Sequence, residues 1–265
     1  MVWICRFAAG EDIWYGAVDG LDEHDQITED SIVAPIQGHP FVDIRPEGSV
    51  LKLADVRLLA PVIPSKVICV GKNYRAHAAE MGGEVPQEPL LFAKPSTAVI
   101  GSGDPIDLPW QSEQIEHEGE LGVVIGRMCK DVPVELVNDV IFGYTCANDV
   151  TARDLQAKDG QWLRAKGFDT FCPLGPWIQT ELVPADADLT VMVNGEKRQH
   201  AGLDAMVHDV PSLVSYISSC MTLLPGDVIL TGTPEGVGPL ESGDSVSVQI
   251  TGIGTLTNPV RSAAP

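Results

Sequence analysis

Positive charge is scarce in this sequence. The 265 residues include 17 Lys and Arg against 37 Asp and Glu, so the formal net charge is −20 at pH 7. Because contacts to phosphate need clustered Lys and Arg, this balance argues against nucleic acid as the main partner. It argues equally against binding to an anionic membrane surface.

Long apolar runs are also lacking. No stretch of about 18 apolar residues occurs, which predicts no transmembrane helix. Residues 1–10 contain one base and no apolar core, so we expect no signal peptide. The sequence has no CxxC pair, and its cysteines are scattered: Cys5, Cys69, Cys129, Cys146, Cys172 and Cys220. This pattern favours free thiols in a reducing cytoplasm over a disulfide framework or a zinc site, and leaves a catalytic thiol as an alternative.

The organisation along the chain predicts two units. Residues 1–60 form a small N-terminal domain with strands at 3–7 and 13–18, and they hold 11 acidic against 4 basic residues. Residues 60–64, Ala-Pro-Val-Ile-Pro, are typical of a linker, so residues 61–265 form the second domain. A chain of this length can bury a sizeable core without disulfides.

The second domain is predicted to be rich in strands. Alternating or apolar runs predict strands at 66–70, 121–125, 189–193, 244–250 and 255–260. Helices are expected at 73–81 and 211–222, and residues 151–156 are expected to start a helical turn. Asn194-Gly195 predicts a tight hairpin. The expected fold class is therefore α+β: a β-rich roll or sandwich with small peripheral helices.

Two glutamates open the apolar run at 121–125. Glu118 and Glu120 are two residues apart, so on a strand their side chains point to the same face. Adjacent carboxylates repel unless a cation neutralises them, and a hard divalent ion such as Mg²⁺ does so with oxygen ligands at about 2.0–2.1 Å. The alternative is two exposed glutamates on an acidic protein.

A third acid ends another apolar stretch. Asp149 follows residues 142–148, and a carboxylate at the end of a buried strand is costly unless it is paired or bound to metal. Three carboxylates together with waters would complete an octahedral oxygen site.

Six motifs together resemble the fumarylacetoacetate hydrolase family. In family order between about residues 66 and 258 they are VGKNYRAHAAE (70–80), LFAKPS (91–96), HEGELGVV (117–124), NDVTARDLQ (148–156), KGFDT (166–170) and LPGDVILTGTP (224–234). The resemblance implies a mixed β-sandwich roll of the family type with a small N-terminal domain, a bound Mg²⁺ or Mn²⁺, and a homodimer.

The resemblance also implies roles for individual residues. It assigns the metal ligands to Glu118, Glu120 and Asp149, a catalytic lid pair to His77 and Glu80, an active-site lysine to Lys166, and a substrate contact to Gln156.

The lid pair has a physical reading of its own. His77 and Glu80 are three residues apart and therefore neighbours on one helical face. A carboxylate beside an imidazole raises its basicity and fixes its tautomer, as activation of a water requires. Gly71 and Gly82-Gly83 flank the segment as hinges. The alternative is a surface histidine with an incidental glutamate.

Cations gather in the same motifs. Lys72, Arg75, Lys94, Arg153 and Lys166 lie in or beside them, which in so acidic a protein indicates a small anionic substrate and makes Arg75 a candidate contact. For Lys94 and Arg153 the alternative is that they balance neighbouring acids. Residues 231–234, Thr-Gly-Thr-Pro, offer backbone amides and the Thr233 hydroxyl to a substrate carboxylate, an assignment that follows mainly from the resemblance.

The predicted function is hydrolysis of a C–C bond in an acylpyruvate, a 2,4-dioxo acid, by water that His77 activates. The same site would also serve decarboxylation of oxaloacetate, or decarboxylation or isomerisation of a 2-hydroxyhepta-2,4-diene-1,7-dioate. A remote alternative is a metabolite-binding protein without activity. The longer hydrolases of tyrosine breakdown have a fourth carboxylate ligand upstream of the lid, whereas residues 67–74 contain no Asp or Glu. The chain therefore resembles the smaller, broader branch of the family.

Overall fold

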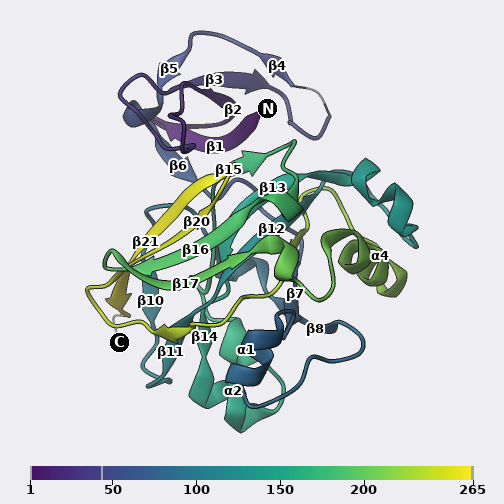
Figure 1. Ribbon diagram of the computed structural model, residues 1–265. Helices are drawn as coiled ribbons and strands as arrows, with labels where there is room; N and C mark the ends of the chain where they lie inside the picture. The colour runs from purple at the N-terminus through teal and green to yellow at the C-terminus, as the bar shows by residue number, and fades with distance from the viewer. Residues whose placement is uncertain (1, 43, 264–265) are drawn as a thin grey trace.

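Short strands make up most of the fold (Figure 1). The computed structural model describes residues 2–42 and 44–263. The largest sheet contains β1 (Trp3–Ala9), β2 (Asp12–Asp19), β3 (Ile32–Gln37), β4 (Arg45–Pro46), β5 (Leu51–Lys52), β6 (Arg57–Leu59), β7 (Val67–Gly71), β8 (Leu90–Lys94), β9 (Val99–Ile100), β12 (Gly119–Ile125), β13 (Ile141–Asn148), β15 (Cys172–Gln179) and β18 (Val228–Leu230). Its main path runs β4-β3-β2-β1-β15-β13-β12-β18-β7-β8. Because β1 pairs with β15, this sheet runs across the division predicted at residue 60.

Two smaller sheets complete the strand framework. The first consists of β10 (Ile106–Leu108), β16 (Asp188–Val193), β17 (Glu196–Gly202), β20 (Ser245–Ile250) and β21 (Gly254–Ser262), in the order β10-β21-β20-β16-β17. The second consists of β11 (Ile115–His117), β14 (Thr151–Ala152) and β19 (Gly238–Pro239), with β11 in the middle. Strands β16 and β20 pack on β12 and β13, so the core is a sandwich of two sheets.

The sandwich confirms the predicted fold class. Side chains of β12, β16 and β20 meet in one buried cluster that includes Leu121, Val123, Leu189, Val191 and Val248. Every residue of β12 is buried, as the apolar run predicts. The predicted hairpin is also present: β16 and β17 are joined by Asn194 and Gly195, both at positive φ (54° and 80°).

Helices are short and lie at the periphery (Figure 1). The α-helices are α1 (Arg75–Glu80), α2 (Arg153–Asp159), α3 (Leu163–Lys166) and α4 (Val210–Cys220). The 3-10 helices are η1 (Leu53–Asp55), η2 (Ser96–Ala98), η3 (Val134–Asp139), η4 (Pro184–Asp186) and η5 (Leu203–Ala205). Among the helices of the described ranges, none has the length and apolar character needed to cross a bilayer.

Local chemistry sets the helix ends. Asp209 caps α4 by accepting the Ser212 N–H at 2.9 Å, and Leu213 and Ile217 bury the apolar face predicted for this helix. Helix α1 begins two residues later than predicted. Asn73 is held outside the helix because its side chain donates to the carbonyls of His208 and Thr231.

Candidate metal centre and active site

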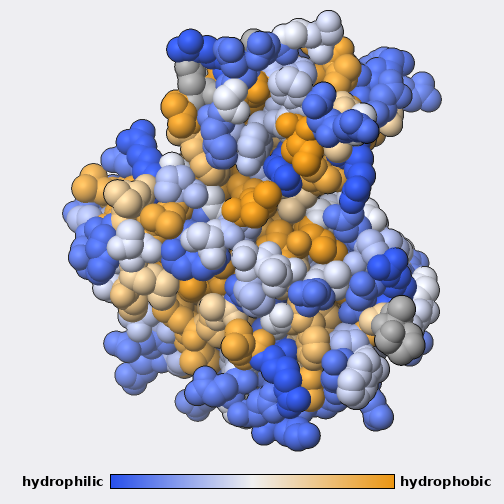
Figure 2. All heavy atoms as spheres, turned by 180° about the vertical axis from the view of Figure 1, so that it is seen from behind, coloured by the Kyte–Doolittle hydropathy of each residue, from blue (hydrophilic) through white to orange (hydrophobic). Residues whose placement is uncertain are grey.

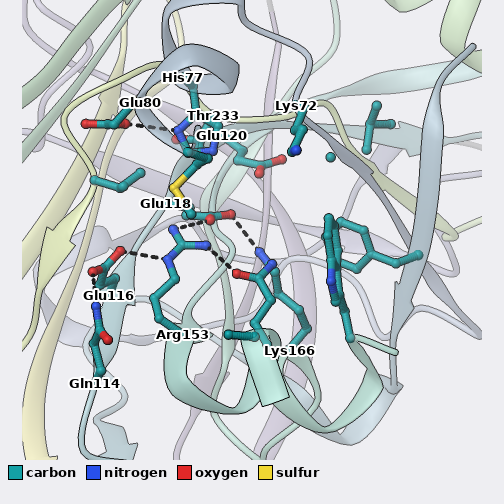
Figure 3. A pocket seen from close by; sticks show the side chains of 18 residues that line it. Lys72, His77, Glu80, Gln114, Glu116, Glu118, Glu120, Arg153, Lys166 and Thr233 are labelled. Atoms are coloured by element: carbon teal, nitrogen blue, oxygen red, sulfur yellow. Dashed lines mark hydrogen bonds and ion pairs between the residues drawn. The ribbon is translucent and has the colours of Figure 1, made fainter. Parts of the chain in front are cut away.

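A cavity of about 610 Å³ opens beside α1, α2 and the ends of β7 and β12. It gathers most of the side chains that the sequence singles out, although they come from segments far apart in the chain. The residues that line it are Val70, Gly71, Lys72, His77, Glu80, Met81, Phe92, Gln114, Glu116, Glu118, Glu120, Arg153, Gln156, Ala157, Trp162, Lys166, Thr233 and Val237 (Figure 3).

Three buried carboxylates cluster beside this cavity, and two of them, Glu118 and Glu120, line it. Ligand atoms of Glu118, Glu120 and Asp149 all lie within 4.8 Å of one another. Backbone pairing brings two of them together, because the Asp149 N–H donates to the Glu118 carbonyl at 2.8 Å. Glu118 lies between β11 and β12 rather than inside a strand, and Glu120 lies within β12.

Lysines hold two of these carboxylates. Lys166 Nζ donates to Glu118 Oε2 and Asp149 Oδ2, both at 2.7 Å. Lys94 Nζ donates to Asp149 Oδ1 at 2.5 Å and to the Val150 carbonyl at 3.1 Å. Lys94 therefore balances a neighbouring acid, the second of the two readings that its position in the sequence allows.

Glu116 and Arg153 extend this network. The Arg153 guanidinium donates through Nε to Glu116 Oε2 at 2.7 Å and forms an ion pair with Glu118 Oε1 at 2.5 Å. Its third nitrogen donates to Gln156 Oε1 at 3.0 Å. Sequence reasoning missed Glu116, and the concentration of cations in the motifs is the signal that points to Arg153.

The pKa values of the two glutamates of the centre are shifted in opposite directions. Burial alone would raise the pKa of Glu118, but the adjacent Lys166 and Arg153 cations hold it well below its usual range. For Glu120, burial and the negative charges of Asp149 and Glu118 together raise the pKa well above its usual value. One Glu120 oxygen accepts the Gly232 N–H at 2.6 Å.

This donor set fits a hard divalent cation. All of its ligand atoms are carboxylate oxygens, and each oxygen keeps further lone pairs beside the hydrogen bonds and ion pairs described above. Around the centre, four carboxylates face three cations: the partly buried Glu116 and the buried Glu118, Glu120 and Asp149 against the buried Lys94, Arg153 and Lys166. The negative charge left over is the one that a cation would neutralise, and Glu120 is its natural location.

The predicted lid pair lines the same cavity. His77 is 5% exposed, and its Nδ1 lies 3.1 Å from Glu80 Oε2. Because an ionised carboxylate only accepts hydrogen bonds, His77 donates through Nδ1 and keeps Nε2 as the basic nitrogen. The second Glu80 oxygen accepts the Gly236 N–H at 3.0 Å, which ties α1 to the segment 232–237. The reading as a surface histidine is therefore wrong.

The predicted substrate contacts have different surroundings. Gln156 lines the cavity, and because its carbonyl accepts from Arg153, its NH₂ group is what it offers to a substrate. The Thr233 hydroxyl also lines the cavity, but it donates to the Gly119 carbonyl and accepts from Gln199, both at 2.8 Å.

The structure does not bring Arg75 to the cavity. Arg75 is exposed at the start of α1, because residues two apart on a helix are rotated by about 200° and His77 faces inward. Lys72, just before the helix, lines the cavity instead.

No cysteine lines the cavity within the described residues. All six cysteines are free, as predicted. Burial raises the pKa of Cys5, Cys146 and Cys172 to about 12, which leaves them as inert thiols rather than nucleophiles.

Two family descriptions match this chain. The fumarylacetoacetate (FAA) hydrolase C-terminal description matches residues 66–261, and the Rv2993c-like N-terminal description matches residues 4–61. Protein Rv2993c of Mycobacterium tuberculosis is 54% identical over 261 residues, which are 97% of each chain. The mitochondrial oxaloacetate tautomerase FAHD1 of Arabidopsis thaliana is 46% identical over 195 residues, 71% of this chain and 87% of the relative.

Solved structures with the same fold include two enzymes of different reaction type. A 2-hydroxyhepta-2,4-diene-1,7-dioate isomerase from Mycobacterium marinum is 49% identical, with a TM-score of 0.92 and full coverage of both chains. A maleylpyruvate hydrolase from Sphingobium sp. SYK-6, in complex with manganese(II) ion and pyruvate, is 31% identical, with a TM-score of 0.78 over 99% of this chain and 100% of that chain.

Proposed function

The chain belongs to the fumarylacetoacetate hydrolase family, and from this premise we propose that it is a Mg²⁺- or Mn²⁺-dependent hydrolase that cleaves a C–C bond in acylpyruvate-type substrates. One observation carries the proposal: the His77–Glu80 pair lines the same cavity as Glu118 and Glu120, which cluster with the fully buried Asp149 (Figure 3). A base for water and a centre for an anionic 2-oxo acid therefore lie side by side.

Glu118, Glu120 and Asp149 are the residues that would hold the cation. A divalent cation supplies Lewis-acid stabilisation of the negative charge that develops on the 2-oxo group. Counting Glu116, the groups around the centre carry one surplus negative charge, and a divalent cation would turn this into one surplus positive charge, which suits an anionic substrate. The maleylpyruvate hydrolase was solved with manganese(II) ion and pyruvate, which supports both a divalent cation and an anionic 2-oxo acid at this site.

His77 acts as the general base. Glu80 holds the imidazole with Nε2 as the basic nitrogen, so His77 takes a proton from water as the oxygen attacks the distal carbonyl carbon. The bond between that carbon and the pyruvate methylene breaks, and its electron pair stays on the pyruvate fragment as an enolate. A proton is then added to the methylene carbon of the enolate, so the products are a carboxylic acid and pyruvate.

Lys166 and Gln156 interact with the negatively charged oxygen atoms of the substrate. The Lys166 ammonium lies between two carboxylates at 2.7 Å from each, and it also lies 4.9 Å from the centre of the Phe92 ring. It therefore keeps its charge and stabilises negative charge on the substrate. Gln156 offers its NH₂ group to a substrate oxygen.

A second candidate is proton transfer or decarboxylation on the same site. The relatives named as an oxaloacetate tautomerase and as a dioate isomerase favour it, because both reactions move a proton next to a 2-oxo group. Neither reaction consumes water, so neither needs His77 as the activator of a nucleophile.

The test is a panel of acylpyruvates, oxaloacetate and 2-hydroxyhepta-2,4-diene-1,7-dioate, each assayed with Mg²⁺ and with Mn²⁺ for the wild type and His77→Ala. We expect release of pyruvate from at least one acylpyruvate and loss of that activity in the variant. Turnover of oxaloacetate or the dioate alone, without acylpyruvate cleavage, would replace the first candidate by the second.

We also propose a homodimer working in a reducing cytoplasm. Figure 2 shows hydrophobic residues gathered on the rear face, where the N-terminal strands adjoin the rest of the chain. Val42 and Ile63 are 87% and 69% exposed and line a second cavity of about 600 Å³. Exposed apolar residues of this kind favour a surface that a second copy of the chain covers. The six free thiols favour a reducing cytoplasm.

A further inference from the structure

One cation that lines the active-site cavity has no partner in the described part of the chain. Lys72, Arg153 and Lys166 all line the cavity. Arg153 and Lys166 are paired with buried carboxylates, whereas Lys72 forms neither a hydrogen bond nor an ion pair with the described residues. Its charge is therefore available to a ligand.

The backbone holds Lys72 in an uncommon conformation. Its φ is +58°, in the left-handed region that residues other than glycine rarely adopt. The chain is fixed on both sides, since Gly71 ends β7 and the Asn73 side chain accepts the His208 N–H and donates to two carbonyls. Such a conformation persists only where the surrounding structure enforces it, and it is concentrated at functional sites.

The Lys72 ammonium lies against the chain just after α1. A Cβ added to Gly83 would lie 2.7 Å from Lys72 Nζ, so the absence of a side chain at this position leaves room for the ammonium. In Figure 3, Lys72 lies on the opposite side of the carboxylate centre from Glu116 and Gln114. The cavity therefore presents two separate positions for negative charge on a ligand: the carboxylate centre with its bound cation, and the Lys72 ammonium.

We propose that Lys72 is a specificity-determining residue that binds a second, distal carboxylate, so that the preferred substrates are 2-oxo acids with a carboxylate at each end. This inference rests on the proposed function, because it assumes that the 2-oxo carboxylate lies at the three-carboxylate centre. Phe92 and Trp162, with ring centroids 5.2 Å apart, give the cavity an apolar wall for the carbon chain between the two charged ends.

The test measures binding rather than turnover. Two 2-oxo acids of equal chain length, one ending in a carboxylate and one in the matching carboxamide, are titrated calorimetrically into Mg²⁺-loaded protein. A charge-assisted contact is about twice as strong as a neutral one, so we expect the wild type to bind the dicarboxylate at least about tenfold more tightly. Lys72→Met should reduce this ratio to about one, and Lys72→Arg should retain most of it.

Two further variants keep the result interpretable. Gly83 is not at positive φ, so Gly83→Ala keeps the backbone and displaces only the Lys72 ammonium; it should reduce the ratio without removing a charge. Lys158→Met is the matched control, because Lys158 is an exposed lysine of α2 outside the cavity, and it should keep the wild-type ratio.

A wild-type ratio near one, an unchanged ratio in Lys72→Met, or failure of both ligands to bind would overturn the proposal. The ratio does not depend on catalysis. Selective binding without acylpyruvate cleavage would refute the proposed reaction and keep the role of Lys72, whereas cleavage without selective binding would do the reverse.

Discussion

Glu120 offers a direct test of the electrostatics of the carboxylate centre. Its side chain is buried, its pKa is raised by burial and by the charges of Asp149 and Glu118, and its Oε2 accepts the Gly232 N–H. Glu120→Gln keeps the volume and a hydrogen-bond acceptor but removes the charge. We expect this variant to be more stable than the wild type without metal and to lose the stabilisation that Mg²⁺ provides.

The magnitude follows from proton linkage. An unfolded glutamate has a pKa of about 4.3, and a folded state that keeps Glu120 protonated loses about 1.4 kcal/mol of stability for each pH unit above this value. The loss therefore reaches at most about 4 kcal/mol at pH 7. Because the folded protein binds the proton more tightly, the stability of the wild type falls as pH rises, and the advantage of Glu120→Gln grows.

The assay is urea unfolding in EDTA at several pH values between 5 and 8, repeated with Mg²⁺. With Mg²⁺ at 100 times its dissociation constant, the wild type should gain about 2.7 kcal/mol and Glu120→Gln much less. Glu113→Gln is the control, because Glu113 is exposed and outside the cavity, and it should follow the wild type at every pH. Parallel pH dependences for the wild type and Glu120→Gln would refute the reasoning.

Three further predictions address the base, the core and the assembly. His77→Ala should lower kcat for acylpyruvate hydrolysis by roughly 10²–10⁴, the usual contribution of a positioned general base, while the increase in Tm caused by Mg²⁺ stays; an unchanged kcat would rule out the role of His77. Leu213→Ala should reduce the free energy of unfolding by about 2–5 kcal/mol, because Leu213 is fully buried on α4; denaturant unfolding measures this, and a loss below 1 kcal/mol would contradict the packing. Light scattering should give about twice the 28.3 kDa of the chain, and a monomer at micromolar concentration would contradict the homodimer.

Local spacing predicted those parts of the site that depend on local geometry. His77 and Glu80, three residues apart, are hydrogen-bonded on α1. Asn194-Gly195 forms the predicted hairpin. Contacts of this kind are determined within one turn of helix or one turn of chain, so the sequence alone contains the information.

Contacts between distant segments could not be predicted in this way. Arg153 binds Glu116 across 37 residues, and the Gly236 N–H reaches Glu80 across 156 residues. Both depend on how the sheets pack and on the register between strands, which spacing in one sequence does not specify. Arg75 shows the same limit at short range. The motif contains two cations, and the orientation of α1 turns Arg75 away from the cavity, whereas Lys72, just before the helix, lines it.

The most direct measurement of the central claim is mass spectrometry of the products of acylpyruvate turnover in H₂¹⁸O with Mg²⁺. If His77 activates water for attack on the distal carbonyl, the released carboxylic acid carries one ¹⁸O from solvent and forms in equal amount with pyruvate. If the site only moves protons or releases CO₂, the substrate carbon skeleton or its decarboxylated form is recovered, and no labelled acid appears. That second result would contradict the assignment of this protein as a C–C bond hydrolase.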